Sequence, residues 1–417
     1  MKIIYFHQYF NTPEMSGGTR SYEMARRLVE AGHEVHIITS WLKETTEKDW
    51  YTTVEAGIKV HWFPNYYNNK MSYVDRIKAF FRFAYHATKK GKSLQADLVF
   101  ATSTPLTIAI PAIFTARALK IPMVFEVRDL WPELPIAMGV LKNKFLQKAA
   151  YKLEDWAYRN STAIVALSPG MKEGIVKTGY PAERVAVIPN SSDNELFNVN
   201  PVKVDEFRHS LEWLKDRPLI VYTGTFGYIN GVGYLVEIAE KLKKLNSEIR
   251  ILLVGDGVEY DQVKKQAESL NVLNKNLFMM KQVPKKDIPV ILSAATICTA
   301  LFIDKPEMRA NSANKFFDGL AAGRPIMINY GGWMVDLIEK NNCGIVTWKL
   351  SIDDAAKKIV NYLDNVEQLQ FIAKNAKILA ETQFSRDRLA SQLNMVLIDS
   401  LNHSGNTSQK ITLEYYD

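Results

Sequence analysis

Residues 311–325, NSANKFFDGLAAGRP, predict one short helix whose ends and faces differ in chemical character. Asn311 or Ser312 is suited to cap its first free amides, because both side chains accept hydrogen bonds from backbone N–H groups. Gly323 can adopt the left-handed conformation past the end of the helix, and Pro325 prevents its continuation. We therefore expect a helix of about ten residues.

This helix is expected to have one polar and one apolar face, because residues three and four apart lie on the same side. The polar residues are Asn314, Lys315 and Asp318, and the residues left for the core are Phe316, Phe317 and Leu320. Unpaired N–H groups, the positive end of the helix dipole and the Lys315 ammonium together suit a phosphate. The Asp318 carboxylate, one turn further on, suits the hydroxyls of a ribose. The alternative is a weak surface ion pair between Lys315 and Asp318.

Length and composition indicate two globular domains. A chain of 417 residues is longer than a single hydrophobic core usually supports, so we expect two domains of about 180 to 200 residues each. Cys298 and Cys343 lack metal-ligand spacing, which indicates buried free thiols in a reducing compartment. The N-terminal residues show no signal-peptide pattern, and apolar runs such as 163–167 are far shorter than the about 20 residues that cross a bilayer. We expect a cytoplasmic protein.

The net charge of +7 is concentrated in the first half of the chain. Residues 1–195 carry 25 Lys and Arg against 19 Asp and Glu (+6), and the remainder carries 27 against 26 (+1). Residues 70–92 form a basic, aromatic helical pattern that predicts contact with anionic lipid or an acidic substrate. Its apolar side is predicted to be Val74, Ile77, Phe80, Phe81, Ala84 and Tyr85, and its basic side Lys78, Arg82, His86, Lys89 and Lys90. A core-packed helix with a solvated basic back is the alternative.

The first half begins with a strand, a glycine turn, a helix and a second strand, which is the opening of a parallel doubly wound sheet. The strands are expected at 2–9 and 34–39, and Gly17 and Gly18 in the turn between them would let the backbone approach a phosphate closely. A plain turn is the alternative. Further strands are expected at 57–63, 96–101, 122–126, 163–167 and 185–189.

Ionisable residues follow the predicted strand 122–126 directly. Glu126, Arg128, Asp129 and Glu133 stand together at the strand's end, before and after a proline. Such a position is energetically costly for charges without a function, so it favours a functional site over a structural one.

The second half predicts a further parallel sheet of the same design. We place the boundary near residues 196–216, after which a strand at 219–222 leads into Gly224-Thr225 and a strand at 249–254 leads into Gly255-Asp256-Gly257. A strand at 325–329 follows the helix that contains Lys315. A helix at 385–401 is followed by a polar tail.

Taken together, the motifs resemble the GT-B glycosyltransferases (family 4 type), the retaining nucleotide-sugar group that makes bacterial surface polysaccharides. The chain looks most like a branch that adds N-acetylated amino sugars in O-antigen or capsule assembly. The resemblance covers about residues 1–400. It is carried by Ser16-Gly17-Gly18, Val127–Glu133, Val187-Ile188-Pro189-Asn190, Val254–Gly257 and Ser312–Pro325.

The resemblance implies an α/β protein of two Rossmann-like, doubly wound domains facing across a cleft. Residues 1–195 would hold the acceptor, residues 196–384 the nucleotide sugar, helix 385–401 would cross back to the first domain, and 402–417 would form a tail. Asp318 would hold the ribose, and Gly17 and Gly18 would meet the diphosphate or the donor sugar. The complete predicted nucleotide-sugar site is Gly17, Gly18, Asn190, Gly224, Thr225, Gly255, Asp256, Arg309, Ser312, Asn314, Lys315 and Asp318.

Three departures from the family pattern stand out. The first of two acids that many relatives carry seven residues apart is Ala310 here. The cations that clamp phosphates in relatives are replaced by Gly224-Thr225 and Asn230-Gly231, which leaves Lys315 and Arg309 as candidates to neutralise the diphosphate. A common His-Asp pair is Arg128-Asp129.

The resemblance implies transfer of a sugar from a UDP-sugar to an undecaprenyl-diphosphate-type, lipid-linked acceptor, with the anomeric configuration retained. Asp129 or Glu126, with Arg128 beside them, would orient the acceptor hydroxyl. No cofactor, metal or nucleic acid is expected, and the protein would be peripheral on the inner face of the plasma membrane through helix 70–92. Two rival functions are a nucleotide-sugar epimerase and a non-catalytic UDP-sugar-binding protein.

Overall fold

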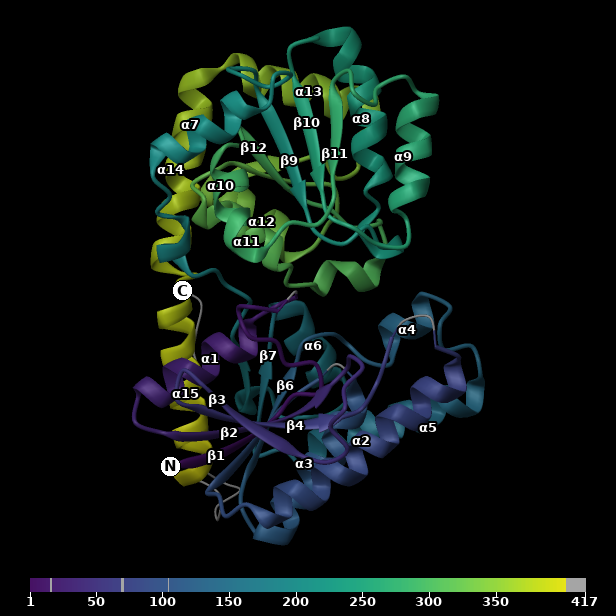
Figure 1. Ribbon diagram of the computed structural model, residues 1–417, viewed down its shortest axis with the longest axis vertical. Coiled ribbons are helices and arrows are strands. Elements are labelled where there is room, and N and C mark those ends of the chain that lie inside the picture. The colour runs from purple at the N-terminus through teal and green to yellow at the C-terminus, as the bar shows by residue number, and fades with distance from the viewer. Residues whose placement is uncertain (16, 69–70, 104, 403–417) are drawn as a thin grey trace. The chain divides into compact units, whose positions relative to one another are not determined.

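The computed structural model describes residues 1–15, 17–68, 71–103 and 105–402, and it divides into two compact units (Figure 1). The first unit comprises Met1–Pro189 with the residues from Asp387 onward, and the second comprises Asn190–Arg386. The division therefore falls before the predicted one at 195 and 196, because the residues after Pro189 bond to side chains of the second unit. Residues 403–417, most of the predicted tail, lie outside the described residues.

The first unit is built on an eight-stranded sheet of order β3-β4-β2-β1-β5-β6-β7-β8. All neighbouring strands are parallel except the edge pair β3 and β4. The inner strands are buried on both faces, so they read as unbroken apolar runs. The strands are β1 Lys2–Phe6, β2 Glu34–Trp41, β3 Tyr51–Glu55, β4 Ile58–Pro64, β5 Leu98–Thr102, β6 Met123–Val127, β7 Ala163–Ala166 and β8 Val185–Val187.

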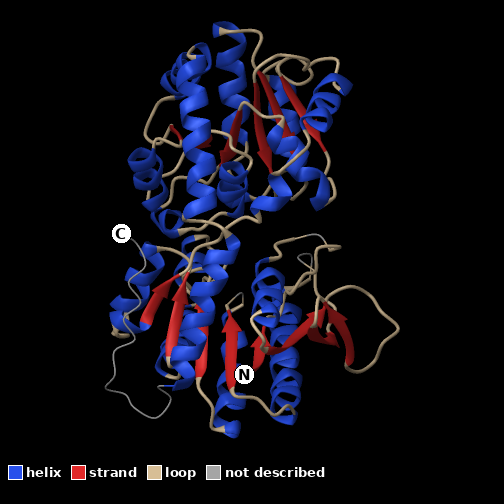
Figure 2. Ribbon diagram, turned by 90° about the vertical axis from the view of Figure 1, so that its left-hand side faces the viewer, coloured by secondary structure: helices blue, strands red, loops and turns tan. Residues whose placement is uncertain are grey.

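Helices cover both faces of this sheet (Figures 1 and 2). One face packs against α1 (Arg20–Glu30) and the last helix, α15 (Arg386–Asn402), whose Leu393 and Leu397 share a buried core with Tyr5 of β1. The remaining helices of the unit are α2 Tyr73–Ser93, α3 Ala109–Leu119, α4 Glu133–Ala137, α5 Lys144–Arg159 and α6 Pro169–Lys177.

The second unit is built on a six-stranded, fully parallel sheet of order β11-β10-β9-β12-β13-β14. The strands are β9 Leu219–Thr223, β10 Arg250–Val254, β11 Leu277–Met280, β12 Ile297–Ala300, β13 Ile326–Ile328 and β14 Gly344–Val346. The helices are α7 Pro201–Ser210, α8 Gly233–Leu245, α9 Tyr260–Ser269, α10 Ile288–Ser293, α11 Asn314–Ala321, α12 Trp333–Asn341, α13 Ile352–Asp364 and α14 Val366–Thr382. Helices α8, α9 and α13 pack over one face, and α11 contacts β12 and α14.

The predicted fold class, two doubly wound α/β domains with parallel sheets, is confirmed. The sequence patterns did not reveal β3, β11, β12 or β14. Of these, β12 matters most, because it lies beside β9 in the middle of the second sheet. Its four residues, ICTA, are too short and too mixed to stand out from a buried helix segment.

Candidate functional site

Lys315, in the first turn of α11, is held over the end of β9. Its Nζ donates to Tyr222 Oη at 3.0 Å and lies 4.5 Å from the centroid of that ring. Tyr222 Oη in turn donates to the backbone oxygen of Thr225 at 2.7 Å. Asn230, with its amide oxygen turned toward the lysine, accepts from Nζ at 3.2 Å. The ammonium is therefore fixed by neutral oxygens and an aromatic face.

Burial lowers the pKa of Lys315 to about 7. Among the residues that the structure describes, no carboxylate forms an ion pair with this ammonium. An uncompensated, partly buried cation is energetically costly unless an anion arrives to pair with it. The geometry therefore suits an anionic ligand at this point.

The glycines after β9 and β10 make room for this lysine. Gly224 has φ +144°, and a Cβ there would lie 3.1 Å from Lys315 Nζ. Gly255 has φ +151°, and a Cβ there would lie 1.8 Å from the Gly224 oxygen. Neither position accepts a side chain without displacing its neighbour. Thr225 follows as an exposed residue, so the predicted Gly224-Thr225 turn lies beside Lys315.

The start of α11 differs from the prediction. The helix begins at Asn314, and its N-cap Ala313 has no side-chain hydrogen bond, so the predicted capping by Asn311 or Ser312 is wrong. Both candidates have other partners: Asn311 Nδ2 donates to the Met308 oxygen, and Ser312 Oγ accepts from the Asn190 backbone N–H at 3.0 Å. The first turn thus lacks a side-chain cap, as a site for an anion would require.

The two faces and the end of α11 agree with the prediction. Phe316, Phe317 and Leu320 are buried, whereas Asn314, Lys315 and Asp318 are partly exposed. At the C-terminal end, the Gly323 N–H donates to the Leu320 oxygen at 2.9 Å and the Arg324 N–H to the Gly319 oxygen at 3.2 Å. Gly323 has φ +62°, which completes a Schellman motif.

Asp318 bonds to the segment that follows the first unit, not to Lys315. Ser192 Oγ donates to Asp318 Oδ1 at 2.7 Å. Burial raises the pKa of Asp318, and the Ser192 hydrogen bond partly opposes that shift. The alternative of a Lys315–Asp318 surface pair is therefore wrong, since each side chain has a different partner. Two residues of the segment after Pro189 thus bond to the region of α11: Asn190 to Ser312, just before the helix, and Ser192 to Asp318, within it.

Two predicted site residues lie apart from this cluster. Asp256 is exposed, pairs with Lys281 at 3.4 Å and accepts from the Gly257 N–H at 2.8 Å. Arg309 is exposed, pairs with Asp304 at 3.7 Å and stacks over a tryptophan ring. Neither residue contacts Lys315. Of the two cations predicted to neutralise a diphosphate, Arg309 already pairs with Asp304, so Lys315 is the better placed.

In the first unit, Glu126 lies inside the sheet and not at its edge. It is 0% exposed, because β6 continues to Val127 and places Glu126 within the strand. Arg20, also buried, donates to Glu126 Oε1 from two nitrogens at 2.8 and 3.0 Å, and Thr102 Oγ1 donates to Oε2 at 2.7 Å. Both carboxylate oxygens are occupied, so this geometry favours a structural role for Glu126.

The other charges predicted at this strand end are more accessible. Arg128 and Asp129 are both partly exposed. The Arg128 backbone N–H donates to Ser103 Oγ at 2.9 Å, and its guanidinium lies 3.4 Å from His7 Nε2. Gly17, with φ +126°, and Gly18 are exposed in the loop before α1; Ser16 lies outside the described residues. The predicted roles of these residues stay predictions.

Sequence reasoning missed several residues that hold the predicted ones in place. Tyr222 contacts Lys315 and Ser192 contacts Asp318, and neither belongs to a recognisable pattern. The sequence identifies Asn230 only as a replacement for a phosphate-clamping cation, and its contact with Lys315 was not predicted. A signal did exist for the Arg20–Glu126 pair. A single acid within the apolar run MVFEV predicts a buried cationic partner, because a charge in a central strand requires one.

Helix α2 exposes Lys78, Arg82 and Lys89 of its predicted basic side, but it also exposes part of its predicted apolar side. Its buried residues are the small Ala79, Ala84, Ala87 and Gly91 with Phe83. A Cβ at Gly91 would lie 2.5 Å from Thr115 on α3, so small residues permit this close packing. Phe81 and Tyr85, predicted to be on the core side, are 55% and 58% exposed beside basic residues. Lys70, in the predicted segment, lies outside the described residues.

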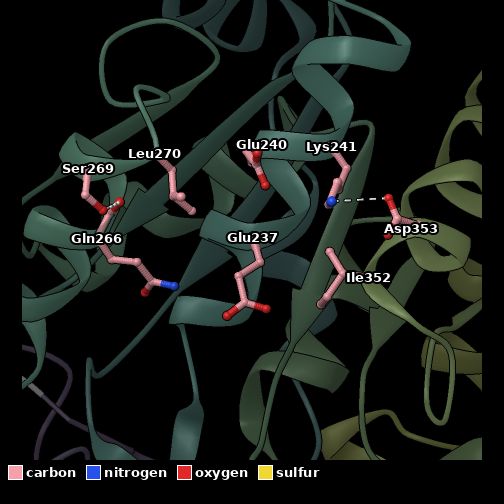
Figure 3. A pocket seen from close by; sticks show the side chains of 8 residues that line it. All are labelled: Glu237, Glu240, Lys241, Gln266, Ser269, Leu270, Ile352 and Asp353. Carbon is pink, nitrogen blue, oxygen red and sulfur yellow. Dashed lines mark hydrogen bonds and ion pairs between the residues drawn. The ribbon is translucent and has the colours of Figure 1, made fainter.

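A separate hollow of about 540 Å³ lies between α8, α9 and the start of α13 (Figure 3). Lys241 and Asp353 form an ion pair of 3.3 Å at one side of it. It contains none of the predicted site residues. The described residues include no group of three or more His, Cys, Asp or Glu side chains arranged to hold a metal. In the same part of the chain, no helix is long and apolar enough to span a membrane.

Comparison with known proteins matches two families to the two halves of the chain. Residues 17–191 match the family described as "Glycosyl transferase 4-like domain", and residues 203–379 match "Glycosyl transferases group 1". A relative named for colanic acid biosynthesis, the glycosyl transferase WcaI of Escherichia coli, is 23% identical over 296 residues, which is 67% of this chain and 72% of that protein.

Solved structures share the fold over nearly the whole chain. Anabaena Alr3699/HepE, solved in complex with UDP and glucose, superimposes with a TM-score of 0.71 at 17% identity, covering 96% of this chain and 100% of that one. Sucrose-phosphate synthase from Thermosynechococcus elongatus gives 0.77 at 14% identity, covering 95% and 98%. At such identities these likenesses show the fold.

Proposed function

This chain belongs to the glycosyltransferases that join a 4-like domain to a group 1 domain, and we propose that it transfers a sugar from a UDP-sugar to a lipid-diphosphate-linked saccharide with retained anomeric configuration. The observation that carries the proposal is Lys315. It is a fixed cation without a carboxylate partner in the described part of the chain, set against Gly224 and the uncapped start of α11. Such a group is suited to the diphosphate of a sugar nucleotide.

In this mechanism, the bond between the sugar's anomeric carbon and the diphosphate oxygen breaks, and a bond to the acceptor oxygen forms on the same face. The acceptor's proton passes to the departing phosphate oxygen. Lys315, the first N–H groups of α11 and its dipole stabilise the negative charge that develops on the leaving group. We propose that these protein groups balance that charge without a metal.

Asp318 is proposed to bind the ribose. Its Oδ1 accepts from Ser192, while Oδ2 can accept from the ribose hydroxyls. In the first unit, Asp129 is the better placed of the two proposed acids to orient the acceptor hydroxyl, because Glu126 is fully occupied by Arg20 and Thr102. We also propose a role in surface-polysaccharide assembly, with an amino sugar as in O-antigen or capsule. The name of WcaI, which refers to colanic acid biosynthesis, supports the polysaccharide role only.

The test is a panel of UDP-sugars. The cognate donor at 100 times its Kd should stabilise the protein by about 2.7 kcal/mol. Mass spectrometry of the same mixtures separates the rival functions: an epimerised sugar without acceptor supports the epimerase, and stabilisation without turnover on lipid-linked acceptors supports the non-catalytic binder. Absence of stabilisation by every UDP-sugar would refute a UDP-sugar donor.

We further propose that α2 contacts the membrane surface. Phe81, Tyr85 and Val74 are exposed on it, and Arg82 and Lys89 lie among them. Exposed aromatic side chains interleaved with cations suit an anionic lipid interface. This placement on the inner face of the plasma membrane would bring the enzyme to a lipid-linked acceptor.

The triple variant R82E/K89E/K90E should sediment less with vesicles of anionic phospholipid than the unmodified protein. A matched control is K264E/K265E/K275E, which makes the same change of charge at exposed positions of the second unit. Equal loss of sedimentation in both variants would indicate general charge attraction and remove α2 as the contact surface.

A further inference from the structure

Three adjacent strands of the first sheet, β1, β5 and β6, end beside one another. His7, Ser103 and Arg128 follow these strands directly. The Ser103 N–H donates to the Glu126 oxygen at 2.8 Å, and Ser103 Oγ accepts from the Arg128 N–H at 2.9 Å. The backbone at Arg128 is thus fixed at the carboxyl ends of the strands, where ligands of doubly wound domains bind.

The Arg128 guanidinium has no carboxylate partner among the described residues. The nearest acid in the strand, Glu126, already binds Arg20 through two nitrogens and Thr102 through its second oxygen. The only side-chain hydrogen bond of the Arg128 guanidinium in the same part of the chain is to His7 Nε2, at 3.4 Å. A guanidinium is a cationic group that only donates hydrogen bonds, so Arg128 is suited to bind an anionic ligand.

The contact with Arg128 also fixes the hydrogen of His7. A guanidinium nitrogen can only donate, so His7 Nε2 must accept and Nδ1 must carry the hydrogen. Burial, together with the Arg128 charge, holds the pKa of His7 well below its usual range, so the ring is neutral. Its Nδ1 is buried and has no hydrogen-bond partner among the described residues. Among the described residues, the His7 Nδ1 hydrogen therefore has no hydrogen-bond acceptor and the Arg128 guanidinium has no carboxylate.

We infer that Arg128 binds an oxyanion, a carboxylate or a phosphate group, carried by the acceptor, and that His7 is a positioning residue that holds the guanidinium toward it. This inference rests on the proposed function and names the acceptor class: a saccharide with a negative charge near the accepting hydroxyl. A guanidinium binds either anion through two parallel hydrogen bonds, so both sources share one recognition chemistry. A neutral acceptor would leave Arg128 without a partner.

The experiment compares small ligands that differ in charge, with UDP present at saturation so that the donor site is filled. The ligands are methyl glucoside, methyl glucuronide and glucose 1-phosphate, and their Kd values are measured by NMR titration of the full chain. The unmodified protein should bind one charged ligand about tenfold more tightly than methyl glucoside. Preference for the glucuronide identifies a carboxylate, and preference for glucose 1-phosphate identifies a phosphate.

The variants R128Q and R128K complete the test. R128Q should bind the charged and neutral ligands within about twofold of each other, and R128K should keep part of the preference because it keeps the charge. R117Q, which changes an exposed arginine of α3 in the same unit, should leave the preference intact. UDP binding by R128Q equal to that of the unmodified protein shows that the variant is folded.

The inference is overturned if the unmodified protein shows no preference for either charged ligand, or if R128Q keeps the preference. Failure of the proposed function is a separate result: the unmodified protein would then either not bind UDP, or bind a UDP-sugar without transferring the sugar to a lipid-linked acceptor. H7N supplies a second readout for positioning: the charge preference should weaken by a few-fold, and the Kd for methyl glucoside should stay unchanged.

Discussion

Glu126 in the first unit and Lys315 in the second are both ionisable residues that the sequence predicts at the carboxyl end of a parallel sheet, yet their surroundings are opposite. Glu126 is completely buried and has two cationic or hydroxyl donors at 2.7 to 3.0 Å. Lys315 is partly exposed, and its partners are a tyrosine hydroxyl and an amide oxygen. One charge is compensated within the domain and the other is not.

The pKa values follow this difference. Burial alone would raise the pKa of Glu126, but the charges of Arg20 and Arg128, with hydrogen bonds from Arg20 and Thr102, lower it overall. Burial lowers the pKa of Lys315 to about 7, and no charged group among the described residues opposes this shift. A compensated charge points to a structural role and an uncompensated one to ligand binding.

The largest expected effect comes from breaking the compensated pair. Glu126→Gln should lower the free energy of unfolding by about 3 to 5 kcal/mol, because it leaves the buried Arg20 guanidinium without its counter-charge. Urea denaturation measures this loss. Glu183→Gln, at an exposed position of the same unit, is the matched control and should change stability by less than about 0.5 kcal/mol.

A double variant sharpens the same comparison. Replacing Arg20 by Met and Glu126 by Leu removes both charges, so it should be less destabilising than Glu126→Gln alone. If the double variant is the less stable of the two, the hydrogen bonds from Arg20 to the Ile188 and Pro189 oxygens contribute more than the charge pair does.

The next effect is on turnover. Lys315→Met removes the cation proposed to stabilise the departing diphosphate. The activation free energy of sugar transfer, followed by the UDP that is formed, should therefore rise by about 2 to 4 kcal/mol, as for loss of a preorganised charge. Lys377→Met is the control, because Lys377 Nζ donates to the Ala321 oxygen at the other end of α11. An equal fall in rate for both variants would place the effect in the helix and not in the phosphate site.

A smaller effect is expected from pH. The ammonium form of Lys315 binds the diphosphate, so affinity for a UDP-sugar should fall by up to about tenfold per pH unit above the free protein's pKa of about 7. The stability of the ligand-free protein should change in the opposite sense: between pH 7 and the ordinary lysine value of 10.5, the unfolded chain binds more protons, so this group's contribution rises with pH.

Calorimetric titration of a UDP-sugar between pH 6.5 and 9 measures the affinity trend. Lys315→Arg keeps its charge throughout this range, so its affinity should be nearly independent of pH. A steep decline in the arginine variant would assign the pH dependence to another group.

The sequence predicted the fold well because strands buried on both faces leave unbroken apolar runs, as in β5 and β9. It also predicted the polar and apolar faces of α11. It failed where one residue of register decides the outcome. The predicted strand ends at Glu126, whereas β6 ends at Val127. This difference of one residue made the buried Glu126 look like a residue at the end of the sheet.

The contacts of the site lay beyond sequence reasoning for a related reason. Tyr222 approaches Lys315 across 93 positions and Ser192 approaches Asp318 across 126, and no local pattern encodes such pairs. On α2, the hydrophobicity of Phe81 and Tyr85 predicts that they face the core, but both are exposed. The core side is instead formed by small residues such as Ala79, Ala87 and Gly91, because they allow close packing against α3.

The smallest predicted effect concerns Asp318, which stands between the two extremes because one protein donor holds it and a ligand is proposed as the other. Ser192→Ala removes the hydroxyl that donates to Oδ1 at 2.7 Å, so the free energy of unfolding should fall by about 1 kcal/mol. With saturating UDP the loss should be smaller, because ribose hydroxyls can donate to the oxygen that Ser192 has left. Equal losses with and without UDP in urea denaturation would mean that the ribose does not reach Asp318, and would class it with Glu126 as a structural acid.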